Sequence, residues 1–389
     1  MTAISGTGGD YESIKTISAV DARQVRLKYS ADVPNTDMLS PGPPVRRVDL
    51  TRAILAADLQ SAHMYQQVFL EDSADLIPET TSLGASAATL RTLKAGGEAE
   101  FGYSNAYTGV KLDANRSKSP NYYSYMQFGK LRRVGDGTAH VSVLVNDAPV
   151  DLPAVRAQGE FAGDKAEFFF LDDPSNPLTL AFRIGIDAIK PLVPEAVKMC
   201  ENIRRMGKSG AAFLGGLHCD RPNGGDADAL RVVKIAFHCA PPLGAPAGPP
   251  GSSVGQPPTV AASGDVGRLE QALAARKPVD VYSIYFGFNS DSIRDESEPT
   301  LKEIAELMRR HPEWKLGVSG HTDSIGDDAY NLGLSSRRAA AVKAALGSRY
   351  GIALARLATN GFGRSQPRDT NDTLEGRARN RRVELVRTD

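Results

Sequence analysis

The chain has 389 residues, of which 41% are apolar, and its 46 basic residues balance 46 acidic ones. This length allows two domains of ordinary soluble composition. A formal net charge of zero leaves no global field to recruit nucleic acid, and no run of about 18 apolar residues is present to span a bilayer as a helix.

Strand patterns dominate the first part of the chain. Residues 1–18 are polar and rich in Gly and Ser, which is typical of a flexible lead-in. Alternating side chains predict strands over residues 23–29 and from Val45 onward. The run AILAADLQSAHMYQQVF, residues 53–69, is rich in good helix formers and predicts a helix.

Residues 101–131 combine aromatic and polar side chains, in the runs FGYSNAYTGVKL and NYYSYMQFGKL. Aromatic residues are favoured on the faces of β-sheets, so a sheet is the expected structure. The alternative is a surface that contacts sugar or peptide, because tyrosine combines a flat apolar ring with a polar tip.

Further strands are expected where apolar residues alternate or run together, at Ala139–Val145, Ala166–Leu171, Leu178–Ile184 and Leu230–Phe237. The connection DDPSNP, residues 172–177, has turn composition and predicts a β-hairpin. Its adjacent carboxylates could instead form an acid–base pair, although neighbouring residues in a turn usually point apart. A helix is expected from about Pro194 to Met206. Residues 19–239 are therefore expected to form a mostly antiparallel β domain with a few helices.

The three cysteines, Cys200, Cys219 and Cys239, all lie in this first part. An odd number allows one disulfide and one free thiol, with the pairing open. Reduced cysteines in the core are a second alternative. A third is a zinc site that uses the pairs formed with His218 and His238, but adjacent ligands fit one tetrahedron poorly and CxxC spacing is lacking. We expect no metal.

Residues 240–263, APPLGAPAGPPGSSVGQPPTVAAS, contain mainly Pro, Gly, Ala and Ser and no charged residue. A stretch of this composition cannot bury a core of its own. It predicts a semi-extended linker between two domains.

Residues 264–389 predict a second domain in which strands and helices alternate. The expected helices are residues 265–276, 297–310, 329–346 and 372–379, and the expected strands are residues 281–288, 315–320, 356–360 and 382–386. The order β-α-β-α-β-(α)-β predicts a sheet with helices on one face. The chain as a whole is therefore expected to belong to the α+β class.

Within this domain, residues 318–342, VSGHTDSIGDDAYNLGLSSRRAAAV, bring two opposite charges together. Asp323 follows a predicted strand, and Arg338 lies on the next predicted helix, whose first N–H groups add positive potential. A carboxylate accepts hydrogen bonds from an ammonium, and a guanidinium holds a carboxylate with two parallel bonds. The stretch therefore predicts a site for a zwitterion such as an amino acid end group. The alternative is that Asp323 caps the turn and pairs internally with Arg338.

These residues resemble the peptidoglycan-binding domain of the OmpA-like family. The family patterns T-D-x-x-G, N-x-x-L-S and R-A-x-x-V occur here in order, and three further short motifs match. The matching residues are Thr322, Asp323, Gly326, Asn331, Leu334, Ser335, Arg338, Ala339, Val342, Phe286–Ser290, Gly361–Gly363 and Asn380–Glu384. The resemblance covers about residues 265–389 and is specific, because several separated motifs agree.

In this family the ligand is the free end of the diaminopimelate residue in the peptidoglycan stem peptide. The resemblance implies that Asp323 accepts hydrogen bonds from the ligand's ammonium and that Arg338 binds its carboxylate. The other implied residues, which add polar contacts, hold the loop or border the groove, are Asn289, Thr322, Asn331 and Arg381.

The sequence offers no catalytic constellation. We find no nucleophile with an adjacent base, no phosphate-binding Gly loop and no HExxH motif, and arginine cannot act as an acid near neutral pH. We therefore expect a protein that is not an enzyme and needs no cofactor. With the resemblance, this predicts an envelope protein that binds peptidoglycan and thereby tethers its N-terminal domain to the cell wall. The N-terminal domain would have another envelope protein as its partner. One alternative is a wall- or sugar-processing enzyme in the first domain. Another is a component of a secretion or motor assembly.

The resemblance implies a place in the periplasm, at the cell wall or outer membrane of a Gram-negative bacterium. The N-terminal stretch MTAISGTGGDYESIK lacks the basic start and the apolar centre of a secretory signal. We therefore expect a processed or trimmed chain with an added Met1. The alternative is a protein that stays inside the cell.

Overall fold

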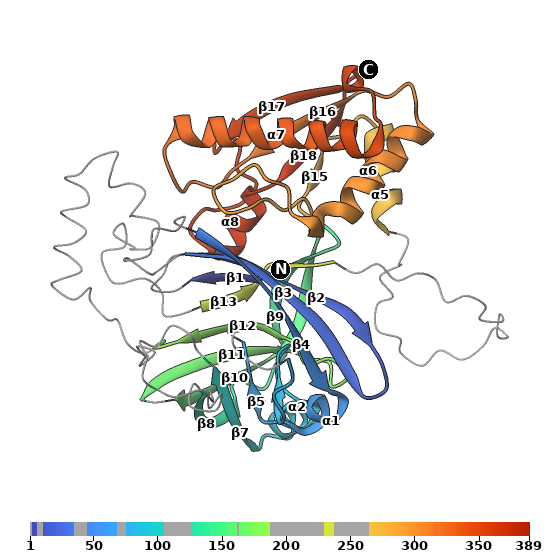
Figure 1. The fold of residues 1–389 in the computed structure, drawn as a ribbon. Coiled ribbons are helices and arrows are strands. Elements are labelled where there is room, and N and C mark those ends of the chain that lie inside the picture. Colours follow the sequence, from blue (N-terminus) through green and yellow to red (C-terminus); the bar gives the residue numbers. More distant parts are fainter. Residues whose placement is uncertain are drawn as a thin grey trace. The chain divides into compact units, whose positions relative to one another are not determined.

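The computed structural model describes residues 2–5, 11–34, 45–67, 75–104, 126–161, 163–186, 229–236 and 264–389 (Figure 1). The chain divides into two compact units. Unit 1 comprises Met1–Val143 and Val150–Val233, and unit 2 comprises Leu144–Pro149 and Lys234–Asp389. The three cysteines with their neighbouring histidines, the helix expected at 194–206 and the linker expected at 240–263 lie outside the described residues.

Unit 1 is built mainly on one sheet. Its strands are β1 (Thr2–Ser5), β2 (Tyr11–Val20), β3 (Gln24–Pro34), β4 (Val45–Leu55), β5 (Met64–Tyr65), β6 (Thr80–Thr81), β7 (Glu98–Ser104), β8 (Met126–Arg133), β9 (Ala139–Val145), β10 (Ala148–Phe161), β11 (Asp164–Leu171), β12 (Thr179–Ile184) and β13 (Ala229–Val232). They follow the spatial order β4-β3-β2-β1-β13-β12-β11-β10-β8-β7-β5-β6, and β9 pairs with β10. Two short helices, α1 (Ala56–Ser61) and α2 (Ala87–Lys94), accompany them.

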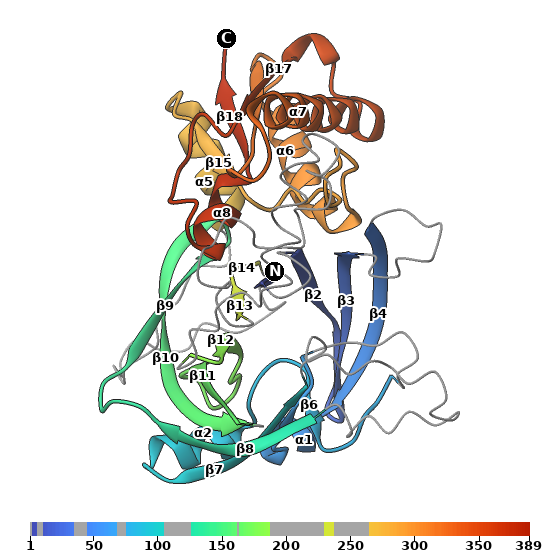
Figure 2. The same cartoon turned by 90° about the vertical axis from the view of Figure 1, so that its left-hand side faces the viewer.

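The core of unit 1 lies inside the curl of this sheet. Figure 2 shows β2–β4 on one side of the unit and β10–β12 on the other, with β7 and β8 at the end between them. Buried side chains from both sides, including Leu27 on β3 and Phe168 on β11, belong to one apolar cluster. The rings of Phe101 and Phe168 meet edge to face with centroids 5.2 Å apart, an arrangement that adds about 1 kcal/mol to the burial of each pair.

The opposite face of the sheet carries a buried ion cluster. The side chain of Glu167 on β11 is fully buried, and its carboxylate accepts hydrogen bonds from Arg156 Nε at 2.7 Å, Gln158 Nε2 at 2.8 Å and Arg183 Nη2 at 2.6 Å. These donors lie on β10 and β12, the strands on either side of β11. Each donor satisfies a charge that would otherwise be costly to bury, so the cluster ties three strands together.

Two expectations for unit 1 are wrong. The flexible lead-in expected over residues 1–18 is instead strand from Tyr11 onward, because β2 pairs along its length with β3. The helix expected over residues 53–69 is largely absent: β4 continues to Leu55, only Ala56–Ser61 is helical, and β5 follows at Met64. Pairing of β4 with β3 as far as Leu55 opposite Gln24 overrides the local helix propensity.

Unit 2 contains a four-stranded sheet in the order β15-β18-β16-β17. Its elements are β14 (Lys234–Ile235), α5 (Gly264–Ala274), β15 (Val279–Val281), α6 (Glu298–Arg310), β16 (Leu316–His321), α7 (Asp328–Tyr350), β17 (Leu357–Gly363), α8 (Leu374–Asn380) and β18 (Val383–Arg387), with short 3-10 turns at Asp295–Ser297 and Leu354–Arg356. Strand β16 is buried at every residue, as a strand between two neighbours requires. The expected α+β class is therefore confirmed.

Helix α7 packs on the sheet at positions that have no side chain. A Cβ added at Gly320 on β16 would lie 2.2 Å from the carbonyl oxygen of Ser335, and one added at Gly361 on β17 would lie 2.5 Å from the backbone nitrogen of Ser336. Ser335 Oγ also accepts a hydrogen bond from the Gly363 N–H at 2.9 Å. This close approach sets the start of α7 against the ends of β16 and β17.

The strand expected over residues 281–288 is wrong beyond its first residue. Strand β15 ends at Val281. The chain that follows is held by the side chain of Ser297 and not by hydrogen bonds to a neighbouring strand. The Tyr285 N–H donates to Ser297 Oγ at 2.8 Å, and that hydroxyl donates back to the Tyr285 carbonyl at 3.1 Å. Asn289 then adopts a left-handed conformation with φ 56°, which ends any extended run.

Candidate functional site

The loop after β16 holds a nearly buried carboxylate. Asp323 is 7% exposed. Its Oδ1 accepts the Ile325 N–H at 3.0 Å, and its Oδ2 accepts a hydrogen bond from Arg381 Nη1 at 2.5 Å. Arg381 follows directly after α8 and remains partly exposed. The carboxylate is therefore fixed by its own loop and by a guanidinium from a distant segment.

Arg338 lies on α7 and contacts the loop that precedes α6. Its Nε donates to the Ser290 carbonyl at 2.9 Å. Its guanidinium carbon lies 4.9 Å from the centre of the Phe286 ring, which is the geometry of a cation–π contact. The ring and the carbonyl orient a planar donor that is partly buried.

Thr322 and Asn331 hold the Asp323 loop in place. The Thr322 N–H donates to the Gly363 carbonyl at 2.9 Å, which ties the loop to the end of β17. Asn331 is buried in the first turns of α7, and its Nδ2 donates to the Ile325 carbonyl at 3.0 Å. Thr322 therefore holds the loop through its backbone N–H, and Asn331 holds it through its side chain.

Tyr330 joins the two groups of residues. Its backbone N–H donates to Asp327 Oδ1 at 2.7 Å, which caps the start of α7. Its hydroxyl donates to Asn289 Oδ1 in the loop that also supplies Ser290. Thr322 and Asp323 thus lie on one loop, which Asn331 and Arg381 contact directly. Asn289 and Arg338 are connected to this loop through α7.

Several contributors have no local signal in the sequence. Asn371 Oδ1 accepts the Ser324 N–H at 3.0 Å and also a hydrogen bond from Asn380 Nδ2 at 3.0 Å. Arg364 donates to Asp328 Oδ1 and, at 3.2 Å, to the Ser324 carbonyl. Neither Asn371 nor Arg364 belongs to the motifs quoted above, and both meet the loop only through the tertiary fold.

His321 lies immediately before this loop and is buried. Its ring stacks on Phe362 with centroids 5.3 Å apart. Neither ring nitrogen has a hydrogen-bond partner within the described part of the chain. Burial, followed by the positive charge of Arg382, lowers the pKa of the imidazole to about 4. The side chain is therefore neutral at physiological pH and serves as packing beneath the Asp323 loop.

Exposed apolar side chains accompany these polar groups. Phe288 precedes Asn289, Ile325 belongs to the Asp323 loop, and Tyr330 and Leu332 lie on the first turns of α7. All four are exposed. The segments that carry an acid, a base and polar amides thus also present apolar surface to solvent.

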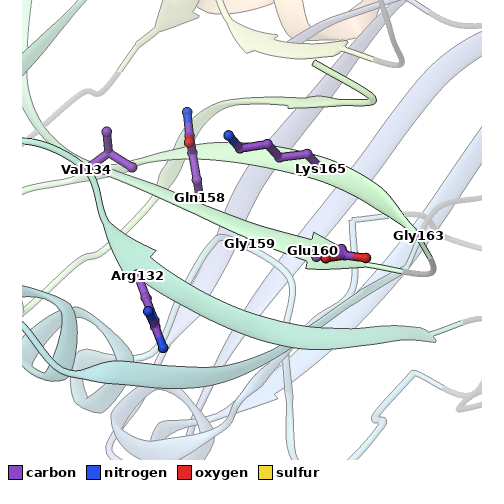
Figure 3. A pocket seen from close by; sticks show the side chains of 7 residues that line it. All are labelled: Arg132, Val134, Gln158, Gly159, Glu160, Gly163 and Lys165. Carbon is purple, nitrogen blue, oxygen red and sulfur yellow. The ribbon is translucent and has the colours of Figure 1, made fainter. Parts of the chain in front are cut away.

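A hollow lies on the outer face of the unit 1 sheet. It has a volume of about 430 Å³ and is lined by Arg132, Val134, Gln158, Gly159, Glu160, Gly163 and Lys165 (Figure 3). Lys165 lies opposite Glu160 in the β10–β11 register, and Arg132 Nε donates to Glu98 Oε1 at 3.0 Å. The hollow is therefore lined by side chains of both charges, and these favour no particular class of ligand.

Two searches of the described residues bear on function. No group of three or more His, Cys, Asp or Glu side chains there is arranged to hold a metal ion. Among the helices of the described ranges, none is long and apolar enough to cross a membrane.

Unit 2 thus has the architecture of a small α+β domain, with an acid, Asp323, on the loop before α7 and a base, Arg338, on α7 itself. Residues 285–381 match the OmpA family, and the C-terminal domain is an OmpA family domain, as the motifs predicted.

The similar proteins match about a quarter to a third of this chain. Outer membrane porin F of Pseudomonas aeruginosa is 44% identical over 101 residues, which are 26% of this chain and 29% of that protein. Peptidoglycan-binding protein ArfA of Mycobacterium bovis is 36% identical over 130 residues, 33% of this chain and 39% of ArfA. The solved cell wall anchor of the T6SS from Pseudomonas aeruginosa is 32% identical, with 32% of this chain and 97% of that chain covered and a TM-score of 0.26. The chain therefore spans under a third of the length of porin F.

Proposed function

We propose that unit 2 binds peptidoglycan without catalysing a reaction and that it recognises the diaminopimelate residue of the stem peptide. The observation that carries the proposal is the nearly buried Asp323 carboxylate on a loop packed against α7, the helix that bears Arg338. Membership of residues 285–381 in the OmpA family supports it, as does the similarity to a protein named for peptidoglycan binding.

Each end of a zwitterionic ligand would meet its complement. The Asp323 carboxylate would accept hydrogen bonds from the ligand's ammonium, as charge-assisted bonds that are stronger than neutral ones. Arg338, oriented by the Ser290 carbonyl and the Phe286 ring, would bind the ligand's carboxylate. Asn289 and Arg381 would border the ligand, while Thr322 and Asn331 hold the loop.

The rest of the chain would then be tethered to the wall. In this proposal residues 264–389 are the wall-binding domain, residues 240–263 are a linker and residues 19–239 form the domain that the wall-binding domain anchors. A linker of this composition would reach roughly 75 Å when extended at about 3.1 Å per residue. The protein would work in the cell envelope, in the periplasm at the wall or outer membrane, where the N-terminal domain meets an envelope protein.

The test is a titration of the full chain with a soluble muropeptide that contains diaminopimelate. We expect Arg338→Ala to weaken binding by about 2–5 kcal/mol, because it leaves the ligand's carboxylate without its partner. Arg337→Ala is the matched control. Arg337 precedes Arg338 on α7, is exposed, and points about 100° away from it around the helix axis. Equal affinity of the two variants would remove Arg338 from the site.

A second titration tests the ligand's chemistry. A muropeptide with lysine at the third stem position lacks the second carboxylate, so it should bind much more weakly to the wild-type chain. If it binds as tightly as the diaminopimelate form, peptidoglycan remains the ligand but the recognised group is another part of it.

A further inference from the structure

Another hollow, of about 460 Å³, lies within unit 2. Its lining residues come from α5, β15, α8 and the loop before α8, and from the segment Leu144–Pro149, all of which belong to this unit. None of them is one of the residues placed around the Asp323 loop. Sites for small molecules commonly have volumes of about 300–1,000 Å³, so the hollow is large enough for a ligand of its own.

Most of the charged side chains in this hollow are paired with one another. Arg368 Nε donates to Asp280 Oδ2 at 2.8 Å, and Arg379 Nη1 donates to Asp369 Oδ2 at 2.7 Å. Because each pair cancels its own charge, neither attracts a ligand strongly. Among the described residues that line the hollow, one basic and one acidic side chain are left outside these pairs.

The basic side chain is that of Arg268 on α5. Its Nε atom is buried and has no hydrogen-bond partner among the described residues. No carboxylate in the described part of the chain forms an ion pair with its guanidinium either. A buried donor without an acceptor is costly, and a planar guanidinium binds a carboxylate with two parallel hydrogen bonds. Arg268 is therefore suited to receive a carboxylate from a ligand.

The acidic side chain is that of Asp147. Its Oδ2 accepts hydrogen bonds from the Tyr282 N–H at 3.1 Å and from the Ser283 hydroxyl at 2.9 Å. Its Oδ1 accepts no hydrogen bond from the described residues. Burial raises the pKa of this carboxyl group, although the positive charges of Lys234 and Arg268 counteract that effect. A cationic donor at Oδ1 would stabilise the charged form of the carboxylate further.

We propose that this hollow binds the zwitterionic form of an amino acid with an apolar side chain, at a second site independent of the Asp323 loop. Arg268 binds the carboxylate of the amino acid, and Asp147 Oδ1 accepts a hydrogen bond from its ammonium. Asp147 would repel a ligand that is only anionic, and Arg268 would repel one that is only cationic. A ligand with both charges therefore fits the hollow best. Leu144 and Ala272, which also line the hollow, offer apolar contact to its side chain.

The test is saturation-transfer NMR on the full chain, with free leucine in its L and D forms as the probe. N-acetyl-leucine, which lacks the ammonium, and leucine amide, which lacks the carboxylate, are titrated in parallel. We expect leucine to bind saturably in at least one form, and the matching N-acetyl and amide derivatives to bind at least tenfold more weakly. Each derivative leaves one of the two charged side chains without its partner.

Variants assign the two charged ends of the ligand. In Arg268→Gln, leucine should lose at least tenfold in affinity and bind no better than leucine amide, because the partner of the carboxylate is gone. In Asp147→Asn, leucine should likewise bind no better than N-acetyl-leucine. A loss of stability alone would not change this discrimination between probes. Lys277→Gln, which removes an exposed positive charge one residue before Pro278 of the lining, is the control and should bind leucine like wild type.

Every titration is repeated on Arg338→Ala, so that leucine held at the proposed peptidoglycan site is not counted. Leucine should bind saturably to this variant whether or not unit 2 binds peptidoglycan. Two results would overturn the proposal. One is no saturable binding of either form of leucine to Arg338→Ala, and the other is equal binding of leucine and either derivative. Should Asp147→Asn fail to fold, the comparison of the three probes decides.

Discussion

The guanidinium of Arg381 lies 2.5 Å from the carboxylate of Asp323, and this ion pair joins the loop after β16 to the residue that follows α8. The two residues are 58 positions apart in the sequence. Any ligand that reaches Asp323 therefore meets a carboxylate that already has one cationic partner. Its ammonium would have to share the carboxylate with Arg381.

We expect Asp323→Asn to lower the affinity for a diaminopimelate muropeptide at least tenfold, the effect of about 1.4 kcal/mol. The amide keeps the shape of the side chain but removes the charge that strengthens its bond to an ammonium. Calorimetric titration measures this change. The matched control is Glu298→Gln, which weakens an exposed ion pair with Arg349 elsewhere in unit 2. Unchanged affinity in Asp323→Asn would show that the ligand's ammonium lies elsewhere.

Gly320→Ala should destabilise unit 2 by about 3 kcal/mol, at the upper end of the range for overpacked cores. The added Cβ would lie 2.2 Å from the Ser335 carbonyl oxygen, which belongs to the backbone of α7 and cannot swing aside. Denaturant unfolding measures the loss. Gly267→Ala in α5 is the control, since its Cβ meets nothing within 4 Å. That variant should be as stable as wild type or slightly more so.

We expect unit 2 to become less stable as the pH falls, because of His321. Its pKa in the folded protein is lowered to about 4, whereas an imidazole in an unfolded chain titrates near 6.5. As pH falls, the unfolded chain takes up the proton first, so the contribution to stability is complete above about 6.5 and is lost between about 6.5 and 4. Urea unfolding at pH 7.5 and at pH 5 measures this loss.

His321→Gln should flatten that dependence on pH, because the variant has no imidazole to protonate. His140→Gln, which changes an exposed histidine on β9, should leave the dependence as it is in wild type. An equally steep loss of stability in His321→Gln would assign the pH dependence to other groups.

Glu167 should make unit 1 sensitive to acid. Burial alone would raise the pKa of its carboxyl group, but hydrogen bonds from Arg183, Gln158 and Arg156 outweigh burial and hold the pKa below its usual value. A depressed pKa means that the stabilisation is present above about pH 4.3, the value in unfolded chains, and is lost as pH falls below it.

Glu167→Gln should therefore cost about 2 kcal/mol at pH 7, because hydrogen bonds to a charged acceptor become neutral ones. The same substitution should cost much less near pH 3, where the wild-type carboxyl also loses its charge. Glu160→Gln on β10 is the control and should have little effect at either pH. Thermal unfolding at the two pH values compares them, and an equal loss at both would contradict the assignment.

Local patterns predicted unit 2 well because its elements are amphipathic and separated by clear turns. The turn at Gly326 and the apolar spacing of Leu334, Ala339 and Val342 place α7 within a few residues of its observed ends. The same patterns could not show that Arg381 is the partner of Asp323, since that contact depends on how α8 closes against the loop. Asn371 was missed for the same reason.

Unit 1 was harder to predict because its structure depends on pairing between strands. The residues of β2 are polar enough to resemble a flexible tail, and those at the end of β4 are good helix formers. Pairing with β3 makes both of them strands: β2 pairs with it from Ser13 to Val20, and β4 pairs with it from Val45 to Leu55. Non-local pairing of this kind leaves little trace in a single sequence.

The residues around the Asp323 loop come from four separate segments, near residues 286–290, 322–325, 330–338 and 371–381. A fragment that lacks one of these segments could not bring the same residues together, so the binding of a ligand there would be thermodynamically linked to the folding of the domain. A guest present at a hundredfold excess over its dissociation constant would add about 2.7 kcal/mol to the free energy of unfolding of unit 2. The wall itself would then protect this domain against heat and proteases.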